Sequence, residues 1–120
     1  MTLLDSNAII YLSKGVISVD EIFIDNAEYA ISVITYMEVL GYSFESKEEE
    51  GFIHNFLKSF KIIYIDDAIA NKVIMLRKIH KIKLPDAIIC ASCLVNGAIL
   101  VTNDIRLKNI PNLKIQQILS

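Results

Sequence analysis

Glycine and proline are scarce in this sequence of 120 residues. It has four glycines and two prolines, 22% of its residues are charged, and 53% are hydrophobic. Disordered chains have few hydrophobic residues and many charged residues, glycines and prolines. The composition therefore excludes disorder and predicts a single folded domain over residues 1–120. Apolar residues are in surplus, and we expect part of that surplus to lie in an interface with a protein partner.

Long apolar runs are absent as well. No window approaches the roughly 18 consecutive apolar residues of a membrane-spanning helix. The start of the chain, MTLLDSNAIIYLS, lacks the basic stretch and the small-residue cleavage site of a signal peptide. We therefore expect a cytoplasmic protein without a membrane partner.

Cysteine and histidine occur only twice each, and neither pair predicts a metal site. Cys90 and Cys93 fall in the middle of the apolar segment IICASCLV, which favours small core residues over a redox pair or a zinc site. Neither His54 nor His80 has a second zinc ligand at motif spacing. Both histidines are predicted to be surface or structural residues.

Acidic residues are nearly missing from the second half of the chain. Residues 1–67 hold 12 acidic and 4 basic side chains, whereas residues 68–120 hold 2 acidic and 8 basic ones. The two acids of the basic half are Asp86 and Asp104. A basic surface around isolated carboxylates suits a polyanion that is held by metal ions.

Apolar runs and helical segments alternate along the chain. Strands are expected at residues 2–5, 29–34, 61–66, 98–104 and 113–119, and helices at residues 6–13, 35–44, 46–60, 67–81 and 84–97. The buried face of the helix at 67–81 is expected to consist of Ile69, Val73, Leu76 and Ile79 or His80. Strands without polar alternation, separated by helices, predict an α/β fold with a central parallel sheet of about four or five strands, flanked by helices on both faces.

Four acids are expected at one edge of this sheet, because open parallel sheets bind ligands beyond the carboxyl ends of their strands. Asp5 follows the first strand, and Glu38 lies one turn into the helix after the second. Asp104 follows the apolar run AILVT, and Asp86 lies in the first turn of the helix that leads into that run. The place of Asp86 at this edge depends on the predicted fold.

Each acid also has an ordinary structural explanation. Asp5 can cap a helix, Asp104 can cap a short turn, and Asp86 can complement a helix dipole. Glu38 fits a capping box that begins at Thr35.

Together, however, four carboxylates at one edge would repel one another unless cations neutralise them. Carboxylates with nearby hydroxyl and amide oxygens favour Mg²⁺ or Mn²⁺ over zinc or copper. Such oxygens come from Ser6, Asn7, Thr102 and Asn103.

Three motifs give the sequence a resemblance to PIN-domain ribonucleases, most closely to the VapC type of toxin from toxin–antitoxin pairs. They are LLDSNAIIYL, ISVITYMEVLGY and KLPDAIICASCLVNGAILVTND, in this order and at the spacing of a compact PIN domain. The resemblance implies a PIN-like fold with Mg²⁺ or Mn²⁺ at a catalytic quartet of acids, which are Asp5, Glu38, Asp86 and Asp104. It also implies endonucleolytic hydrolysis of RNA by metal-activated water, a homodimer, and inhibition by a cognate antitoxin. Asn7 and Thr102 carry over as helper residues.

One position departs from the family pattern. Many relatives add another acid shortly after the fourth one, where this sequence has Arg106. Any metal ligand from that loop must then be Asp104 or Asn103, and a second metal site is expected to be weak or to form only with RNA.

Basic residues of the second half are candidates for contact with the RNA backbone or the antitoxin. They are Lys72, Arg77, Lys78, Lys81, Lys83, Arg106 and Lys108. Each of them can equally belong to an ordinary solvated helix face.

Two other functions remain open from the sequence. One is a catalytically inactive binding module of the same fold, whose acidic pocket captures a partner's arginine, or which binds RNA. The other is a phosphoacceptor domain on a similar sheet. Against the latter, LLDSN has Asn7 where paired acids are needed, and the lysine and proline expected after the last strand are missing.

Overall fold

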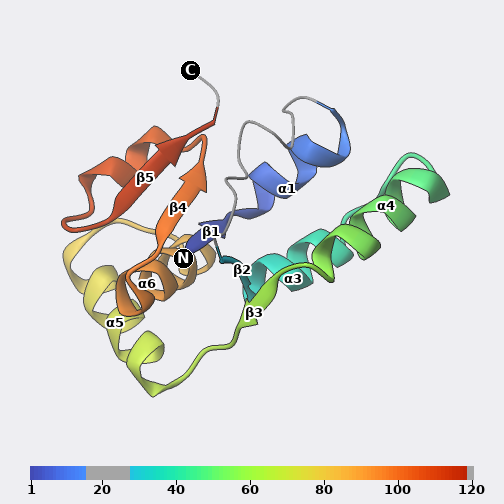
Figure 1. The fold of residues 1–120 in the computed structure, drawn as a ribbon. Helices are drawn as coiled ribbons and strands as arrows, with labels where there is room; N and C mark the ends of the chain where they lie inside the picture. Colours follow the sequence, from blue (N-terminus) through green and yellow to red (C-terminus); the bar gives the residue numbers. More distant parts are fainter. Residues whose placement is uncertain (16–27, 119–120) are drawn as a thin grey trace.

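The computed structural model describes residues 1–15 and 28–118 of the chain. Its strands form one five-stranded sheet in the order β3-β2-β1-β4-β5, and every pairing is parallel (Figure 1). The strands are β1 (Thr2–Leu4), β2 (Tyr29–Ser32), β3 (Lys61–Ile63), β4 (Ile99–Thr102) and β5 (Lys114–Gln117). The helices are α1 (Ser6–Ser13), α3 (Val33–Leu40), α4 (Lys47–Leu57), α5 (Asp67–Ile79), α6 (Leu84–Asn96) and the short 3₁₀ helix η1 (Ile105–Asn109). The expected α/β fold is confirmed. In this described part of the chain, no helix has the length and apolar character needed to cross a membrane.

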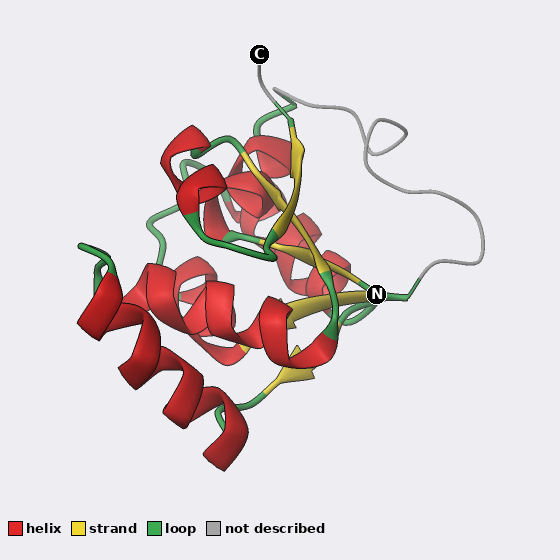
Figure 2. Ribbon diagram, turned by 90° about the vertical axis from the view of Figure 1, so that its left-hand side faces the viewer, coloured by secondary structure: helices red, strands yellow, loops and turns green. Residues whose placement is uncertain are grey.

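Helices cover both faces of the sheet (Figure 2). Helices α5 and α6 pack on one face, where they meet Leu3 and Leu100, and α1, α3 and α4 pack on the other, where they meet Leu4 and Val101. All four of these strand residues are fully buried. Because consecutive residues of a strand point to opposite faces, a sheet covered on both faces needs apolar residues at every position. This requirement explains the strand runs without polar alternation.

The strand order places a topological switch point between β1 and β4. From β1 the chain adds β2 and β3 on one side of the sheet, and it then adds β4 and β5 on the other. A crevice forms at the carboxyl ends of the strands at such a point, because the connections leave in opposite directions. The order also differs from the 2-1-3-4-5 order of receiver-type sheets, which argues against the phosphoacceptor alternative.

Most predicted elements are longer than the observed ones, and the ends of β2, β3 and α5 are among those that differ. Strand β2 ends at Ser32, because the Ser32 hydroxyl accepts a hydrogen bond from the Ile34 backbone N–H at 3.2 Å and caps α3. Strand β3 ends at Ile63, and the next side chain, Tyr64, is 65% exposed. Helix α5 ends at Ile79, whose side chain is 69% exposed and does not share the buried face, whereas His80, the other predicted candidate, is partly buried. The buried face of α5 consists of Ile69, Val73 and Leu76.

Helix α6 begins, ends and packs as its sequence predicts. Pro85 lies in its first turn, and Gly97 ends it in the left-handed conformation, with φ 63°. Residues 87–93 are all buried, both cysteines included. Burial raises the pKa of the Cys90 thiol to about 12, and it also raises the pKa of the Cys93 thiol. The interpretation of both cysteines as core residues is confirmed.

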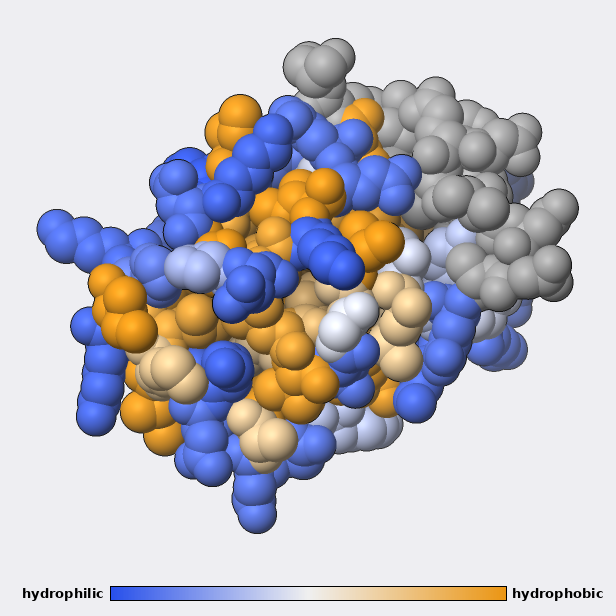
Figure 3. Space-filling model, turned by 60° about the vertical axis from the view of Figure 1, so that its left-hand side comes forward, coloured by the Kyte–Doolittle hydropathy of each residue, from blue (hydrophilic) through white to orange (hydrophobic). Residues whose placement is uncertain are grey.

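Some apolar side chains stay outside the two cores. Figure 3 shows apolar side chains gathered on one face of the molecule, with charged side chains between them. Helix α5 contributes exposed Ile74, Met75 and Ile79. Met75 and Ile79 are four residues apart, so they share one side of the helix.

Candidate functional site

Three of the four predicted acids follow neighbouring strands. Asp5 directly follows β1, Asp104 comes two residues after β4, and Glu38 lies in α3, which begins directly after β2. The strands β2, β1 and β4 are adjacent and parallel. The three acids therefore lie at the carboxyl edge of the sheet, around the switch point.

Asp86 reaches the same edge from a helix. It lies in the first turn of α6, and the other end of α6 leads through Gly97 into the start of β4. The N-terminal end of α6 is thus at the carboxyl edge, where the sequence prediction placed it. Burial, and then the negative charges of Asp104 and Glu38, raise the pKa of the Asp86 carboxyl.

Asp5 is buried, with 8% of its surface exposed, and its carboxylate accepts hydrogen bonds from two donors. Its Oδ1 accepts a hydrogen bond from the Ala8 backbone N–H at 2.9 Å, which makes Asp5 the N-cap of α1. Its Oδ2 accepts one from the Thr102 hydroxyl at 2.5 Å. Burial raises the pKa of Asp5 in spite of these bonds, and the charges of Asp86 and Asp104 raise it further. Asp5 is thus both a helix cap and a member of the acidic group.

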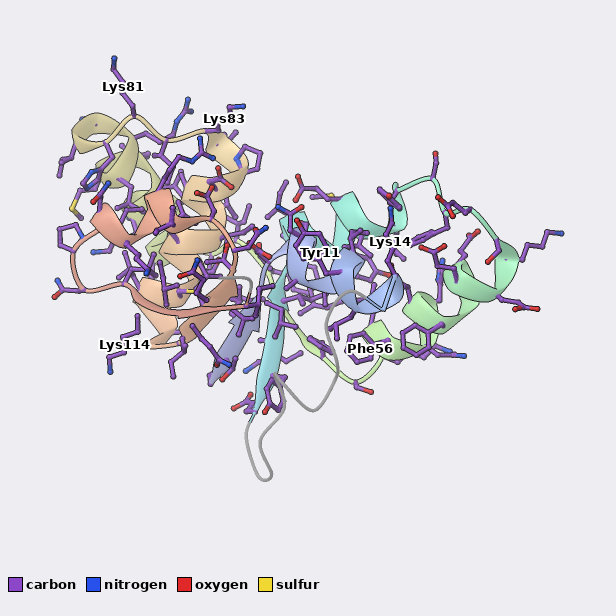
Figure 4. The ribbon with its side chains drawn as sticks, turned by 90° about the horizontal axis from the view of Figure 1, so that it is seen from above. Tyr11, Lys14, Phe56, Lys81, Lys83 and Lys114 are labelled. Atoms are coloured by element: carbon purple, nitrogen blue, oxygen red, sulfur yellow. The ribbon has the colours of Figure 1, made fainter. Side chains whose placement is uncertain are left out.

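Hydrogen bonds tie the loop after β4 to its neighbours. Besides donating to Asp5, the Thr102 hydroxyl accepts a hydrogen bond from the Asp104 backbone N–H at 3.0 Å. Asn103 Nδ2 donates to the hydroxyl of Tyr11 on α1 at 3.0 Å (Figure 4). Sequence reasoning missed Tyr11, because nothing local marks an aromatic residue on a helix as the partner of a loop 92 residues away.

Glu38 is exposed and accepts a hydrogen bond from the Ser6 hydroxyl on its Oε1 at 2.6 Å. The capping-box explanation of Glu38 is wrong, because Ser32 caps α3 and Thr35 is the third residue of the helix. Thr35 is fully buried, and its hydroxyl has no partner among the described residues. Thr35 therefore belongs to the buried side of α3, whereas Glu38 is exposed.

Asp104 is paired with the residue that departs from the family pattern. Its Oδ1 accepts hydrogen bonds from the backbone N–H and from Nε of Arg106, both at 3.0 Å, and its Oδ2 accepts one from Nη2 of Arg106 at 2.7 Å. The guanidinium lowers the pKa of the Asp104 carboxyl. Asp104 also caps η1, which confirms the turn-cap explanation of this residue.

The four carboxylates act on one another electrostatically but do not surround one point. Among residues 1–15 and 28–118, no three His, Cys, Asp or Glu side chains are placed to hold one metal ion. Hydrogen bonds to Thr102, Ser6 and Arg106 hold three of the carboxylates in separate orientations. The donor chemistry nevertheless fits a hard divalent cation, since carboxylate and hydroxyl oxygens lie together at one edge. Shared coordination of an ion requires the side chains of Glu38 and Asp104 to rotate away from their present partners.

Several other predicted residues lie outside this group. Asn7 is exposed on α1, and within the described residues no hydrogen bond joins it to an acid. Arg77 and Lys78 are exposed in the last turn of α5. Lys72 is partly buried on α5, and Lys108 is exposed on η1. Within residues 1–15 and 28–118, no hydrogen bond or ion pair joins these five residues to the four acids.

A pocket of about 430 Å³ adjoins the acids, and three of the predicted basic residues line it. Asp86 and Asp104 form part of its wall, and Lys81, Lys83 and Arg106 form another part. Figure 4 shows Lys81 and Lys83 projecting from one edge of the molecule. The basic half of the sequence thus supplies positive charge directly beside its two acids.

Comparisons with known proteins agree with this architecture. The PIN domain family model matches residues 2–113. Solved structures of similar fold include VapBC2 from Rickettsia felis bound to a promoter DNA fragment, with a TM-score of 0.84 and 24% identity over 98% of each chain. A toxin–antitoxin complex from Klebsiella pneumoniae has a TM-score of 0.76 and 32% identity over 94% of this chain and 95% of that one. DNA-bound VapBC from Salmonella typhimurium has a TM-score of 0.83 and 22% identity over 98% of each chain. No curated protein matches the chain.

The family match covers nearly the whole length of the sequence and includes all four acids. The fold agrees with that of VapBC structures over 98% of the chain. From this match, we conclude that the chain belongs to the PIN-domain family, which confirms that part of the resemblance, and its fold is similar to that of the VapBC structures.

Proposed function

We propose that the chain is a metal-dependent endoribonuclease and the toxin of a toxin–antitoxin pair. The observation that carries the proposal is the convergence of Asp5, Glu38, Asp86 and Asp104 on the carboxyl edge of a parallel sheet at its switch point. Membership of the PIN-domain family supports it, because PIN domains of the VapC type are generally nucleases. Phosphodiester hydrolysis needs negative charge neutralised at the scissile phosphate, and carboxylates do this by holding cations.

The roles of the residues follow from their contacts. The four acids would hold Mg²⁺ or Mn²⁺, which when bound supplies Lewis-acid activation of water and neutralises charge on the phosphate. Thr102 orients Asp5 through its hydroxyl and also binds the backbone N–H of Asp104, so it fixes two of the acids relative to each other. Ser6 holds Glu38 in the same way. No side-chain nucleophile is required.

The partners of the proposed toxin are a cognate antitoxin and a second copy of the chain. Similar structures are VapBC complexes and a toxin–antitoxin complex, which supports an antitoxin partner. Exposed apolar side chains such as Ile74, Met75 and Ile79 are available for an interface. Cytoplasmic action on cellular RNA is part of the same proposal.

The experiment is an incubation of the purified chain, free of any partner, with a mixture of structured RNAs, with and without Mg²⁺ or Mn²⁺. The Asp86→Asn variant is measured beside Asp67→Asn, which removes an exposed acid from the first turn of α5. We expect metal-dependent fragments from the wild type and Asp67→Asn, and none from Asp86→Asn. Fragments of equal yield from all three proteins would refute the role of Asp86.

A second candidate function is a binding module that captures an arginine of a partner protein. The bidentate contact of Arg106 with Asp104 favours it, because it demonstrates that a guanidinium fits at this edge. This module would show no metal binding by calorimetry and no cleavage of any RNA. Metal binding by the wild type that disappears in Asp86→Asn would favour the nuclease over the binding module.

A further inference from the structure

The pocket beside the acids is built from two short segments. One is the turn between α5 and α6 together with the first turn of α6, and the other is η1 with the residue after it. Its volume of about 430 Å³ is in the range of pockets that enclose a small organic ligand. The acids occupy only one part of its wall, so most of its lining has no role in the proposed reaction.

The lining combines an apolar surface with basic groups. Ile82, Leu107 and Ile110 line the apolar part of the pocket. Leu107 and Ile110 belong to the hydrophobic core and form the floor of that part. Lys81 and Lys83 contribute exposed ammonium groups, and neither forms an ion pair within the described residues. Such a pocket suits a ligand that has a flat apolar part and a negative charge close to it.

The charges favour an anion over a neutral ligand. Arg106 neutralises Asp104 through its bidentate contact, and Lys81 and Lys83 line the same pocket as Asp86. Two lysines therefore face one unpaired carboxylate. A cation at the acids would make the pocket still more positive.

We infer that this pocket is a subsite for one nucleotide of an RNA strand, with the base against the apolar wall and the phosphate at Lys81 and Lys83. A nucleotide has the two chemical parts that the pocket matches, and stacking or apolar contact of a base is a general mode of RNA recognition. Asn109 and His80 also line the pocket and offer hydrogen-bonding groups for a base edge.

The subsite adjoins the proposed point of cleavage. Asp86 and Asp104 belong both to the pocket wall and to the acidic group. A nucleotide in the pocket therefore has a phosphate directly beside the acids, and this nucleotide flanks the scissile bond. The inference rests on the proposed function for that last step only. The pocket would then select which nucleotide lies next to the cut.

Binding without cleavage tests the subsite separately from catalysis. Fluorescence anisotropy of a labelled single-stranded RNA hexamer is measured in EDTA over a range of salt concentrations. The Lys81→Gln/Lys83→Gln variant is compared with Lys47→Gln/Lys114→Gln, which removes two equally exposed lysines outside the pocket. Figure 4 shows Lys114 on the opposite side from Lys81 and Lys83.

We expect the pocket variant to lose about tenfold in affinity and the slope of log affinity against log salt to fall by roughly 0.7, as for one neutralised phosphate of a single strand. The control variant should change neither quantity to that extent.

Inorganic phosphate should compete weakly with the labelled RNA, and a nucleoside 5′-monophosphate should compete better, because only the nucleotide also fills the apolar part of the pocket. Equal affinity and slope in the two variants would overturn the subsite. A polyglutamate peptide that competes as well as the RNA would also overturn it, in favour of an acidic protein segment.

Asn109→Ala provides a readout of base recognition. Asn109 is exposed, so its truncation leaves the core intact. We expect a smaller share of the cuts in a pool of RNAs to fall beside the nucleotide that the wild type prefers, whatever the change in total cleavage. Unchanged positions would contradict base recognition by this residue. If the chain cuts no RNA at all but the lysine variant still loses RNA affinity, the subsite stands and the proposed nuclease activity fails.

Discussion

Each of the four carboxylates has different partners, which determine how it can respond to a cation. Asp5 is fixed by Ala8 and Thr102, and Asp104 is fixed by Arg106. Asp86 is half-buried, and no hydrogen bond contributes to the shift of its pKa. A half-buried acid beside other acids is the residue with most to gain from a bound ion.

Replacement of Asp86 is expected to stabilise the metal-free protein. The pKa of Asp86 is raised on folding, so its carboxyl stabilises the fold below about pH 4, and this contribution is lost as the pH rises through the raised pKa. Asp86→Asn stays neutral, and it should therefore melt at a higher temperature than the wild type in EDTA at about pH 7.5, with the difference vanishing near about pH 3. Differential scanning fluorimetry measures this.

The control for Asp86→Asn is Asp67→Asn. Asp67 is exposed in the first turn of α5, where its charge is favourable with the helix dipole. Its replacement should leave the melting temperature unchanged or slightly lower. If Asp86→Asn behaves like this control at neutral pH, the carboxylate of Asp86 is destabilised neither by burial nor by repulsion from its neighbours.

Arg106 is expected to compete with a metal ion for Asp104. Its guanidinium engages both carboxylate oxygens, so the ion must displace it. The pair is largely exposed on the arginine side, and exposed ion pairs are weak, so the loss of Arg106 should change the affinity for a metal ion only a few-fold. Arg106→Gln should therefore bind Mn²⁺ about two- to fivefold more tightly in calorimetry without RNA.

Lys108→Gln is the matched control for this variant, because Lys108 lies on the same 3₁₀ helix and its partner is Gln117 rather than an acid. It should leave Mn²⁺ affinity unchanged. Weaker Mn²⁺ binding by Arg106→Gln would mean that the arginine supports the site rather than competes for it.

At the scale of elements, the sequence predicted all five strands and the helices α1, α3, α4, α5 and α6, because apolar runs and helix-end residues are local signals. Ser6–Ser13 and the Pro85 and Gly97 ends of α6 were predicted correctly. The start of α3 was not, because Val33 and Ile34 favour a strand and only the Ser32 cap makes them helical.

The candidate site was predictable only in part, because the sequence carries local signals for helices and strands but none for most side-chain contacts. Positions of the acids relative to the strands follow from the order of elements along the chain. The contacts of Asp104 with Arg106, of Ser6 with Glu38 and of Asn103 with Tyr11 depend on side-chain orientation. The pocket beside Asp86 joins two segments that are about 20 residues apart and carry no shared motif.

Helix α6 is expected to keep its thiols unreactive. Cys90 and Cys93 are buried, and burial raises the pKa of both thiols, that of Cys90 to about 12. The thiolate is the reactive form, so iodoacetamide at about pH 8 should label neither cysteine in the native protein and both after unfolding in urea. Mass spectrometry of the intact chain counts the labels. Rapid native labelling would show that α6 opens far more readily than a core helix should.

At the scale of the whole molecule, the sheet separates two apolar cores, and its carboxyl edge brings the acidic group next to a basic pocket. Acidic residues dominate the first half of the sequence and basic residues the second. The fold places the switch point between β1, from the acidic half, and β4, from the basic half. Both kinds of charge therefore meet at the edge of the sheet where we propose that an RNA phosphate binds.

The exposed apolar side of α5 is expected to lie in a homodimer interface. Met75 and Ile79 share that side of the helix, and a monomer rarely leaves such residues in water together. Light scattering should give twice the mass of the chain for the wild type. Met75→Lys/Ile79→Lys should give the mass of one chain, whereas Ile105→Lys, at an exposed apolar residue of η1, should stay dimeric. A monomeric wild type would exclude the dimer.

The most direct test of the acidic group as a metal centre is an anomalous scattering map from crystals of the chain grown with MnCl₂. We expect a manganese peak at the carboxyl edge of the sheet, within coordination distance of Asp86 and at least one of Asp5, Glu38 and Asp104, and no such peak for Asp86→Asn. A peak bound only elsewhere on the chain, in a protein that still cuts RNA with Mn²⁺, would contradict the assignment of the metal to these acids.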